Sequence, residues 1–78
     1  MSFVSANLTI IFEPGEDGYW VASIAEIPGA FSQGLTQEEA RENVMEAAAE
    51  LMQARKELAL KERAANAIVE IVPLAESA

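Results

Sequence analysis

Apolar and polar residues alternate along the start of the chain. One set of alternate positions is apolar, and the positions between them are mostly polar. The apolar set comprises Val4, Ala6, Leu8, Ile10 and Phe12. A period of two with β-branched and aromatic residues is typical of a half-buried strand, which we expect over 3–13. The turn formers of residues 14–18 then predict a reversal into an antiparallel second strand over 18–25.

The dipeptide Pro28-Gly29 marks the next reversal. Proline fixes φ near the value required at the second position of a turn, and glycine tolerates the positive φ required at the third. The pair therefore predicts a type II turn. A short third strand should follow over 30–34, with Gly34 at its exit.

The apolar period changes from two to 3.6 after Gly34. Thr36 and Glu39 have capping-box spacing, so the Thr36 hydroxyl can accept from the third helical amide while Glu39 reaches back to the cap amide. An apolar stripe follows and predicts a helix over 37–62 that ends between Leu60 and Ala65. The stripe consists of Ala40, Val44, Ala47, Ala48, Leu51, Ala54 or Arg55, and Leu58.

The β-branched segment 67–72 is followed by Pro73 and predicts a fourth strand. The expected fold class is therefore α+β, in the order β-β-β-α-β, with the helix covering one face of the sheet. We expect a single domain over 1–78, with a core of about 3–73 and a short tail over 74–78.

Composition removes several kinds of chemistry. The chain has no Cys and no His, which excludes disulfides and Cys/His zinc sites and removes the usual general base. Its amino terminus lacks the basic residues of a signal peptide, and no apolar run approaches the roughly 20 residues of a membrane helix. We expect a soluble, cytoplasmic protein that does not contact membranes.

The net charge of −8 is unevenly placed. Residues 1–40 contain six acids and no base, whereas residues 41–78 contain seven acids and five bases, so the two halves carry −6 and −2. An acidic surface repels phosphate backbones, so we expect no direct nucleic-acid binding. The same charge favours a basic protein partner, although it also serves solubility.

Acidic residues on the predicted helix do not indicate a metal site. Glu42, Glu46 and Glu50 repeat every fourth position, opposite the apolar stripe, where a solvated helix face is the simpler interpretation. Metal-assisted hydrolysis needs carboxylates that converge from separate elements, and the pattern offers no such set. We therefore expect no catalytic, cofactor or metal site, and no enzyme activity.

Two adjacent aromatic residues indicate a protein contact. Tyr19 and Trp20 are neighbours on a strand, so one should lie in the core and the other on the second sheet face. Phe3 and Ile11 fall on that second face as well, and a domain this small buries a limited share of its surface. A homodimer or higher homo-oligomer is one interpretation, and scattered exposed apolar residues are the other.

The stretch "DGYWVASIAEIPGAFSQGLTQEEARENV" resembles the amino-terminal, toxin-binding domain of HicB family antitoxins, which are of the HicB-like or UPF0150 type. The features that match are Asp17-Gly18-Tyr19, Ile27-Pro28-Gly29, Ser32-Gln33-Gly34, Thr36, Glu39-Ala40 and Asn43-Val44. Ala30 stands where the family frequently has Cys, and Leu35 where a polar residue is usual.

The resemblance implies a truncated ribonuclease-H-like fold that is not a working nuclease. It also implies a partner, a small basic HicA-like toxin that cleaves mRNA and whose active site this domain covers. Many members carry a second, DNA-binding domain, which we do not expect after residue 72. A stand-alone homo-oligomeric HicB-like protein with no toxin is the alternative.

The candidate residues fall into two groups. Acidic and aromatic residues are expected at the partner interface, and turn and cap residues are expected to be structural. The first group is Glu16, Asp17, Tyr19, Trp20 and Glu26. The second group is Pro28, Gly29, Gly34, Thr36 and Glu39.

Overall fold

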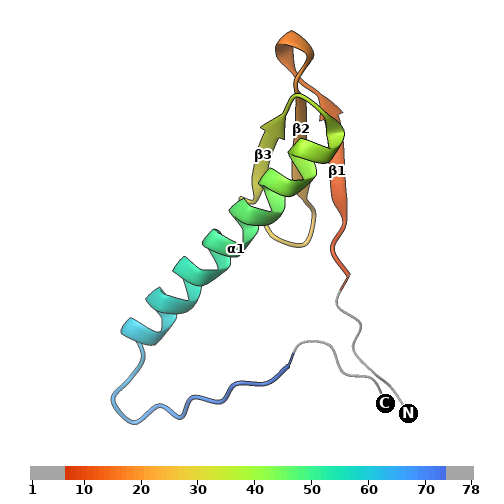
Figure 1. Cartoon of the computed structure of the whole chain (residues 1–78). Coiled ribbons are helices and arrows are strands. Elements are labelled where there is room, and N and C mark those ends of the chain that lie inside the picture. The colour runs from red at the N-terminus through yellow and green to blue at the C-terminus, as the bar shows by residue number, and fades with distance from the viewer. Residues whose placement is uncertain (1–6, 74–78) are drawn as a thin grey trace, which may run out of the picture.

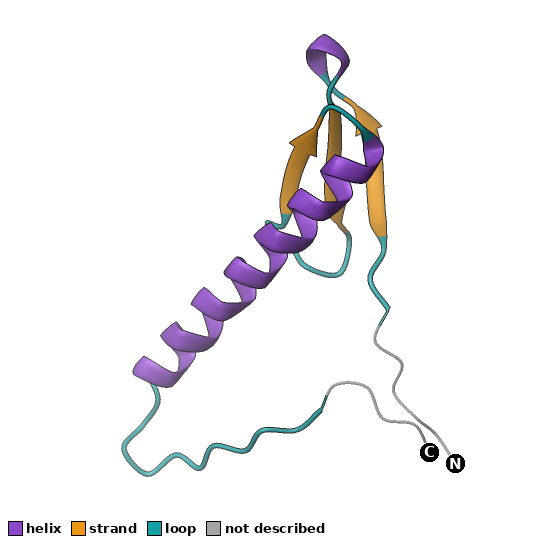
Figure 2. Cartoon of the chain, in the orientation of Figure 1, coloured by secondary structure: helices purple, strands orange, loops and turns teal. Residues whose placement is uncertain are grey.

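The computed structural model describes residues 7–73, which form a three-stranded antiparallel sheet with one long helix across one face (Figures 1 and 2). The elements are β1 (Ile10–Pro14), the 3-10 turn η1 (Glu16–Gly18), β2 (Trp20–Ile24), β3 (Phe31–Gly34) and α1 (Gln37–Lys61). The strands lie in the order β1-β2-β3. The small α+β arrangement that the sequence predicted is confirmed.

A tight reversal joins β1 to β2. The N–H of Gly15 donates to the carbonyl of Tyr19 at 2.7 Å, and the N–H of Tyr19 donates to the carbonyl of Glu16 at 3.1 Å. Asp17 has φ 58° and Gly18 has φ 79°, both in the left-handed region. Asp and Gly tolerate this conformation better than other residues, which explains why the turn formers occur here.

The second reversal joins β2 to β3 at Pro28-Gly29. The N–H of Ala30 donates to the carbonyl of Ile27 at 3.1 Å, and Gly29 has φ 92°. A bond between the first and fourth residues with positive φ at the third is the type II arrangement.

The core lies between α1 and the sheet and is built mainly from small residues. The buried set is Ala22, Ile24, Ile27, Ala30, Ala40, Val44 and Ala48, with Ile10, Phe12, Trp20 and Leu51 packed partly buried around it. Alanine at several facing positions lets the helix approach the sheet closely. Two hydrogen bonds from the helix hold it in place: Asn43 Nδ2 to the Gln33 carbonyl at 2.9 Å and Arg55 Nη2 to the Pro28 carbonyl at 2.8 Å.

The start of α1 has side-chain caps, with one difference from expectation. The Thr36 hydroxyl accepts from the N–H of Glu39 at 3.0 Å, as expected. The Glu39 carboxylate, however, accepts from the N–H of Leu35 at 2.7 Å, one residue before the cap. The bond from the Ile24 N–H to the Ala30 carbonyl means that alternate positions from Ala30 to Gly34 bond toward β2, so the Leu35 amide faces away from β2 and the carboxylate satisfies it.

The predicted first strand and apolar stripe were both too long. β1 begins at Ile10, because β2 ends at Ile24 and only the bond from the Ala25 N–H to the Thr9 carbonyl extends the pairing. The part of the prediction over 3–6 lies outside the described residues. The helix ends at Lys61, within the expected range, but Leu58 is 54% exposed because α1 runs past the sheet (Figure 1).

The predicted fourth strand over 67–72 is not formed. This segment is exposed and has no strand assignment; after α1 the chain turns back and runs below the helix, apart from the sheet (Figure 1). A strand needs a ladder partner, and none of the three strands of the sheet lies beside this segment (Figure 1). The order of the described elements is therefore β-β-β-α. The predicted tail over 74–78 lies outside the described residues.

Gly34 is the position where the sheet and the helix start approach most tightly. A Cβ at Gly34 would lie 2.5 Å from the amide nitrogen of Ala40 and 2.9 Å from the Glu39 carbonyl carbon. We expect Gly34→Ala to lower the free energy of unfolding by about 2–3 kcal/mol, because backbone atoms must move. Urea unfolding followed by circular dichroism at fixed protein concentration measures this change.

Gly18→Asn is the matched control for Gly34→Ala. A Cβ at Gly18 meets no heavy atom within 4 Å, and Asn tolerates the left-handed backbone there. It should cost less than about 1 kcal/mol. Equal effects of the two substitutions would contradict the close-approach explanation.

Candidate functional site

The sheet face that α1 does not cover is the candidate site, and we call it the outer face. Across it, Ile11 lies opposite Ser23, and Ser23 lies opposite Phe31. In the next row Glu13 lies opposite Val21, and Val21 opposite Gln33. Ile11 is 46% exposed and Phe31 67% exposed. Two large apolar side chains therefore lie exposed on the two outer strands, in one row with a serine between them.

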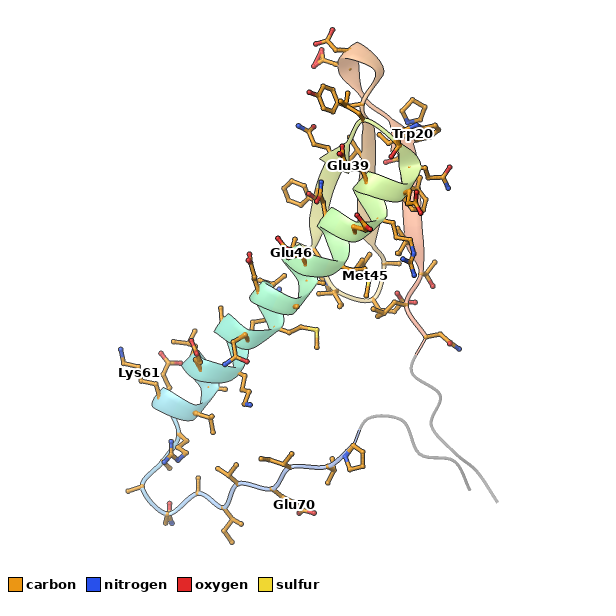
Figure 3. All side chains as sticks on the ribbon, viewed as in Figure 1. Trp20, Glu39, Met45, Glu46, Lys61 and Glu70 are labelled. Carbon is orange, nitrogen blue, oxygen red and sulfur yellow. The ribbon has the colours of Figure 1, made fainter. Side chains whose placement is uncertain are left out.

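The structure separates the two adjacent aromatic residues. Trp20 is on the helix face, where it packs partly buried against the core (Figure 3). The extended backbone at Tyr19 continues the alternation, so its half-buried side chain belongs to the outer face. Trp20 is thus a structural residue, and Tyr19 remains the aromatic candidate for a partner contact.

An acidic tip borders the outer face. Glu13 at the end of β1 and Glu16 and Asp17 in η1 are all exposed. Residues 7–40 contain no Lys or Arg to neutralise them. The outer face therefore has an apolar row with three exposed acidic residues at one end.

Glu26 has a different role from the acids of the tip. Its carboxylate accepts from the N–H of Thr9 at 2.7 Å and from the Thr9 hydroxyl at 2.5 Å. These hydrogen bonds, led by that from the hydroxyl, favour the ionised form and lower the pKa of Glu26 below its ordinary value. Glu26 joins the chain after β2 to the chain before β1.

The turn and cap residues support the outer face rather than line it. Pro28 and Gly29 set the reversal into β3, Gly34 allows the helix to start against the sheet, and Thr36 and Glu39 cap that helix. They set where β3 begins and where α1 follows it, and Phe31 is the first residue of that strand.

Sequence reasoning did not name Phe31 and Gln33 as site residues. Phe31 alternates with the buried Ala30, and this was the available signal that Phe31 faces away from the core. The signal was weak because a strand of four residues gives almost no period, and only the register of β3 on β2 places Phe31 in a row with Ile11.

The described residues hold no obvious catalytic constellation. Glu42, Glu46 and Glu50 are exposed, and within 7–73 no group of three or more His, Cys, Asp or Glu residues is placed to hold a metal ion. An open hollow of about 330 Å³ lies beside β1, lined by Phe12, Gln37, Glu38 and Arg41. None of the described helices is long and apolar enough to cross a membrane.

Comparison with known proteins gives one informative similarity. The chain is 46% identical over 39 residues to UPF0150 protein Ta0767 of Thermoplasma acidophilum, a match that covers 50% of this chain and 56% of the relative. It supports a relationship to the UPF0150 family. The matched segment spans little more than half of the relative's length. No family profile matches the chain, and no solved structure matches it.

The contact between Glu26 and Thr9 should make stability depend on pH. A lowered pKa in the folded state means that the stabilisation is fully present above the ordinary glutamate pKa of about 4.3 and is lost as the pH falls through the lowered value. We expect Glu26→Gln to have a lower free energy of unfolding than wild type at pH 7, and the difference between the two to disappear as the pH is lowered. Urea unfolding at a series of pH values measures it.

Substitutions at Thr9 test the same contact from its other side. The quantity to compare is the difference in free energy of unfolding between chains with Glu26 and chains with Glu26→Gln. Thr9→Ser keeps the hydroxyl donor and should leave the pH dependence of that difference in place. Thr9→Val removes the donor and should make the difference smaller. A difference that is constant with pH would show that Glu26 acts through something other than this charged contact.

The acidic tip also predicts how the chain behaves toward nucleic acid. With no base in residues 7–40, we expect negligible binding of DNA or RNA at physiological salt. A mobility-shift titration at two salt concentrations checks this. Tight, salt-sensitive binding would overturn the electrostatic argument.

Proposed function

We propose that this protein is an antitoxin-type binding module that resembles HicB and neutralises a small basic HicA-like toxin, which cleaves mRNA, by covering its active site. One observation carries the proposal: the outer face has an exposed apolar row bordered by an acidic tip. The similarity to a UPF0150 protein supports it, because the resemblance of the sequence to HicB is of that type.

The outer face has the chemistry of a surface that binds a basic protein. Interfaces combine a desolvated apolar centre with a polar rim, and aromatic residues are common anchors. Ile11, Phe31 and Tyr19 supply the centre, and the acids of the tip supply the rim. Acids at the rim raise the association rate with a basic partner and exclude acidic competitors.

On this proposal the protein acts by occlusion and is not an enzyme. It requires no cofactor, and the acids act through charge rather than proton transfer. The order β-β-β-α agrees with the first four elements of the truncated ribonuclease-H-like fold that the HicB resemblance implies.

A stand-alone homo-oligomer without a toxin is the second candidate function. The exposed apolar segment 67–72 favours it, since that segment has no partner within the described chain. The two candidates differ in one respect that is easily measured. Only the antitoxin needs a second gene product.

The test is co-expression with a small basic reading frame encoded beside this one, followed by a growth assay and pull-down. We expect the two proteins to associate and growth to recover, with slower association at higher salt. If no such gene exists, or the proteins neither associate nor relieve toxicity, the antitoxin proposal is wrong.

Single substitutions then locate the binding surface. Phe31→Ala and Tyr19→Ala should each weaken binding by about 2 kcal/mol or more if they are buried anchors. Asp17→Asn, which keeps a residue suited to the left-handed backbone, should cost less than about 1 kcal/mol. Isothermal titration calorimetry with the purified partner measures both.

Controls on the exposed side of α1 complete the design. Met45→Ala removes an exposed apolar side chain and Glu46→Gln an exposed charge, both on the helix (Figure 3). Neither should change the affinity. A larger effect at these two positions than at Phe31 and Asp17 would place the interface on the helix instead of the outer face.

A further inference from the structure

Residues 67–72 have the composition of a buried strand but lie in solvent. Ile68 is 95% exposed and Ile71 87% exposed. As a strand, the segment would place Ala67, Val69 and Ile71 on one face, all of them apolar. An exposed run of apolar, β-branched residues indicates a contact that the single chain does not supply.

The edge of β1 offers the backbone groups that such a strand needs. The bond from the Ala25 N–H to the Thr9 carbonyl, 2.9 Å, fixes the phase of the antiparallel ladder. The backbone N–H and C=O groups of Ile11 therefore point toward β2, whereas the amides of Ile10 and Phe12 point to the open edge. Edge strands are commonly blunted by Lys or Pro, but β1 has no Lys and has Pro only at its last position.

The hollow beside β1 offers space for side chains from an added strand. It has a volume of about 330 Å³ and lies between Phe12 and the first turns of α1. A strand beside β1 would place every second side chain on the helix face, next to the half-buried Phe12. Val69 and Ile71 are apolar side chains at the required spacing.

The far end of α1 indicates that the strand comes from a second copy. The hydrogen bond from Arg55 to the Pro28 turn holds the helix against the end of the sheet. Six further residues carry α1 from Arg55 to Lys61 at its far end (Figure 3). At 1.5 Å per residue this is about 9 Å of helix. Met52 is 51% exposed and Leu58 54% exposed. If 67–72 paired with β1 of the same chain, the apolar residues at this helix end would stay exposed. If it pairs with β1 of a second copy, the sheet of that copy lies against the helix end and covers them.

Charge favours the same arrangement. Residues 55–63 contain Arg55, Lys56, Lys61 and Arg63 against two acids, a net +2, whereas residues 7–40 carry −6. Exchange places the basic helix end of one copy beside the acidic sheet of the other. Opposite charges are brought together, and the two acidic sheets do not have to meet face to face.

We infer that two copies of the chain exchange residues 67–72, each segment pairing as a strand with the open edge of β1 in the other copy. The occupied surface is the β1 edge, so the outer face stays free. The inference is independent of the proposed antitoxin function, and either can fail without the other.

Amide exchange at residue resolution tests the inference, with light scattering on the same samples. We expect a species of twice the 8.4 kDa chain mass at high micromolar concentration. In that species the amides of Ile10 and Phe12, and every second amide of 67–72, should exchange about tenfold or more slowly than in the dilute monomer, because alternate amides of the added strand face β1. In a mixture of isotope-labelled and unlabelled chains, contacts between β1 and 67–72 should be intermolecular.

Two variants of this segment provide the matched pair. Val69→Pro made together with Glu70→Pro removes two neighbouring amides, one of which must face β1 in either strand direction. Neither amide bonds to anything in the described structure, so the helix and sheet should remain, but the dimer should dissociate. Val69→Thr keeps the amide and the β-branched shape and should leave a weakened dimer.

Three results would overturn the inference. Protection of Ile10 and Phe12 that does not change with concentration would mean that the segment folds onto its own sheet. A dimer with these amides unprotected would place the interface elsewhere. A monomer at all concentrations with fast exchange at both segments would mean that no exchange occurs.

Discussion

The close approach of α1 to the sheet is the constraint on which the rest of the structure depends. Ala22 and Ala30 on the sheet and Ala40 and Ala48 on the helix are buried, so the two layers approach closely at these positions, and the larger apolar side chains of the core pack around them. Gly34 extends this closeness to the helix start, where a Cβ would strike backbone. Because α1 covers this face and side chains alternate along each strand, the remaining residues of the sheet lie on the outer face.

Features that depend on residues close together in the sequence were predicted correctly. The strand that was predicted wrongly depended on residues far apart in the sequence. Both turns and the helix start depend on residues within four positions of one another, such as Thr36 and Glu39, so the sequence alone identified them. The fourth strand also needed a neighbouring strand to pair with, and β propensity does not specify that neighbour. Residues 67–72 have the right composition, but no edge of their own sheet is beside them.

The candidate site was predictable only in part for the same reason. Alternation showed that Tyr19 and Trp20 face opposite ways, but the choice of which one is buried required the helix to be in place. Glu26 was expected at the partner interface together with Glu16 and Asp17. Its contact with Thr9 joins residues 17 positions apart, and no periodic pattern reveals that pairing. Phe31 emerged only when the register aligned it with Ile11.

The placement of the two adjacent aromatic residues gives the molecule a built-in pair of optical reporters. Trp20 is the chain's single tryptophan and Tyr19 its single tyrosine, and they lie on opposite faces of the same strand end. Indole fluorescence therefore follows the packing of α1 against the sheet. Phenol absorbance follows the solvent on the outer face. A ligand that docks on that face without disturbing the fold should change the second signal and leave the first largely unaltered.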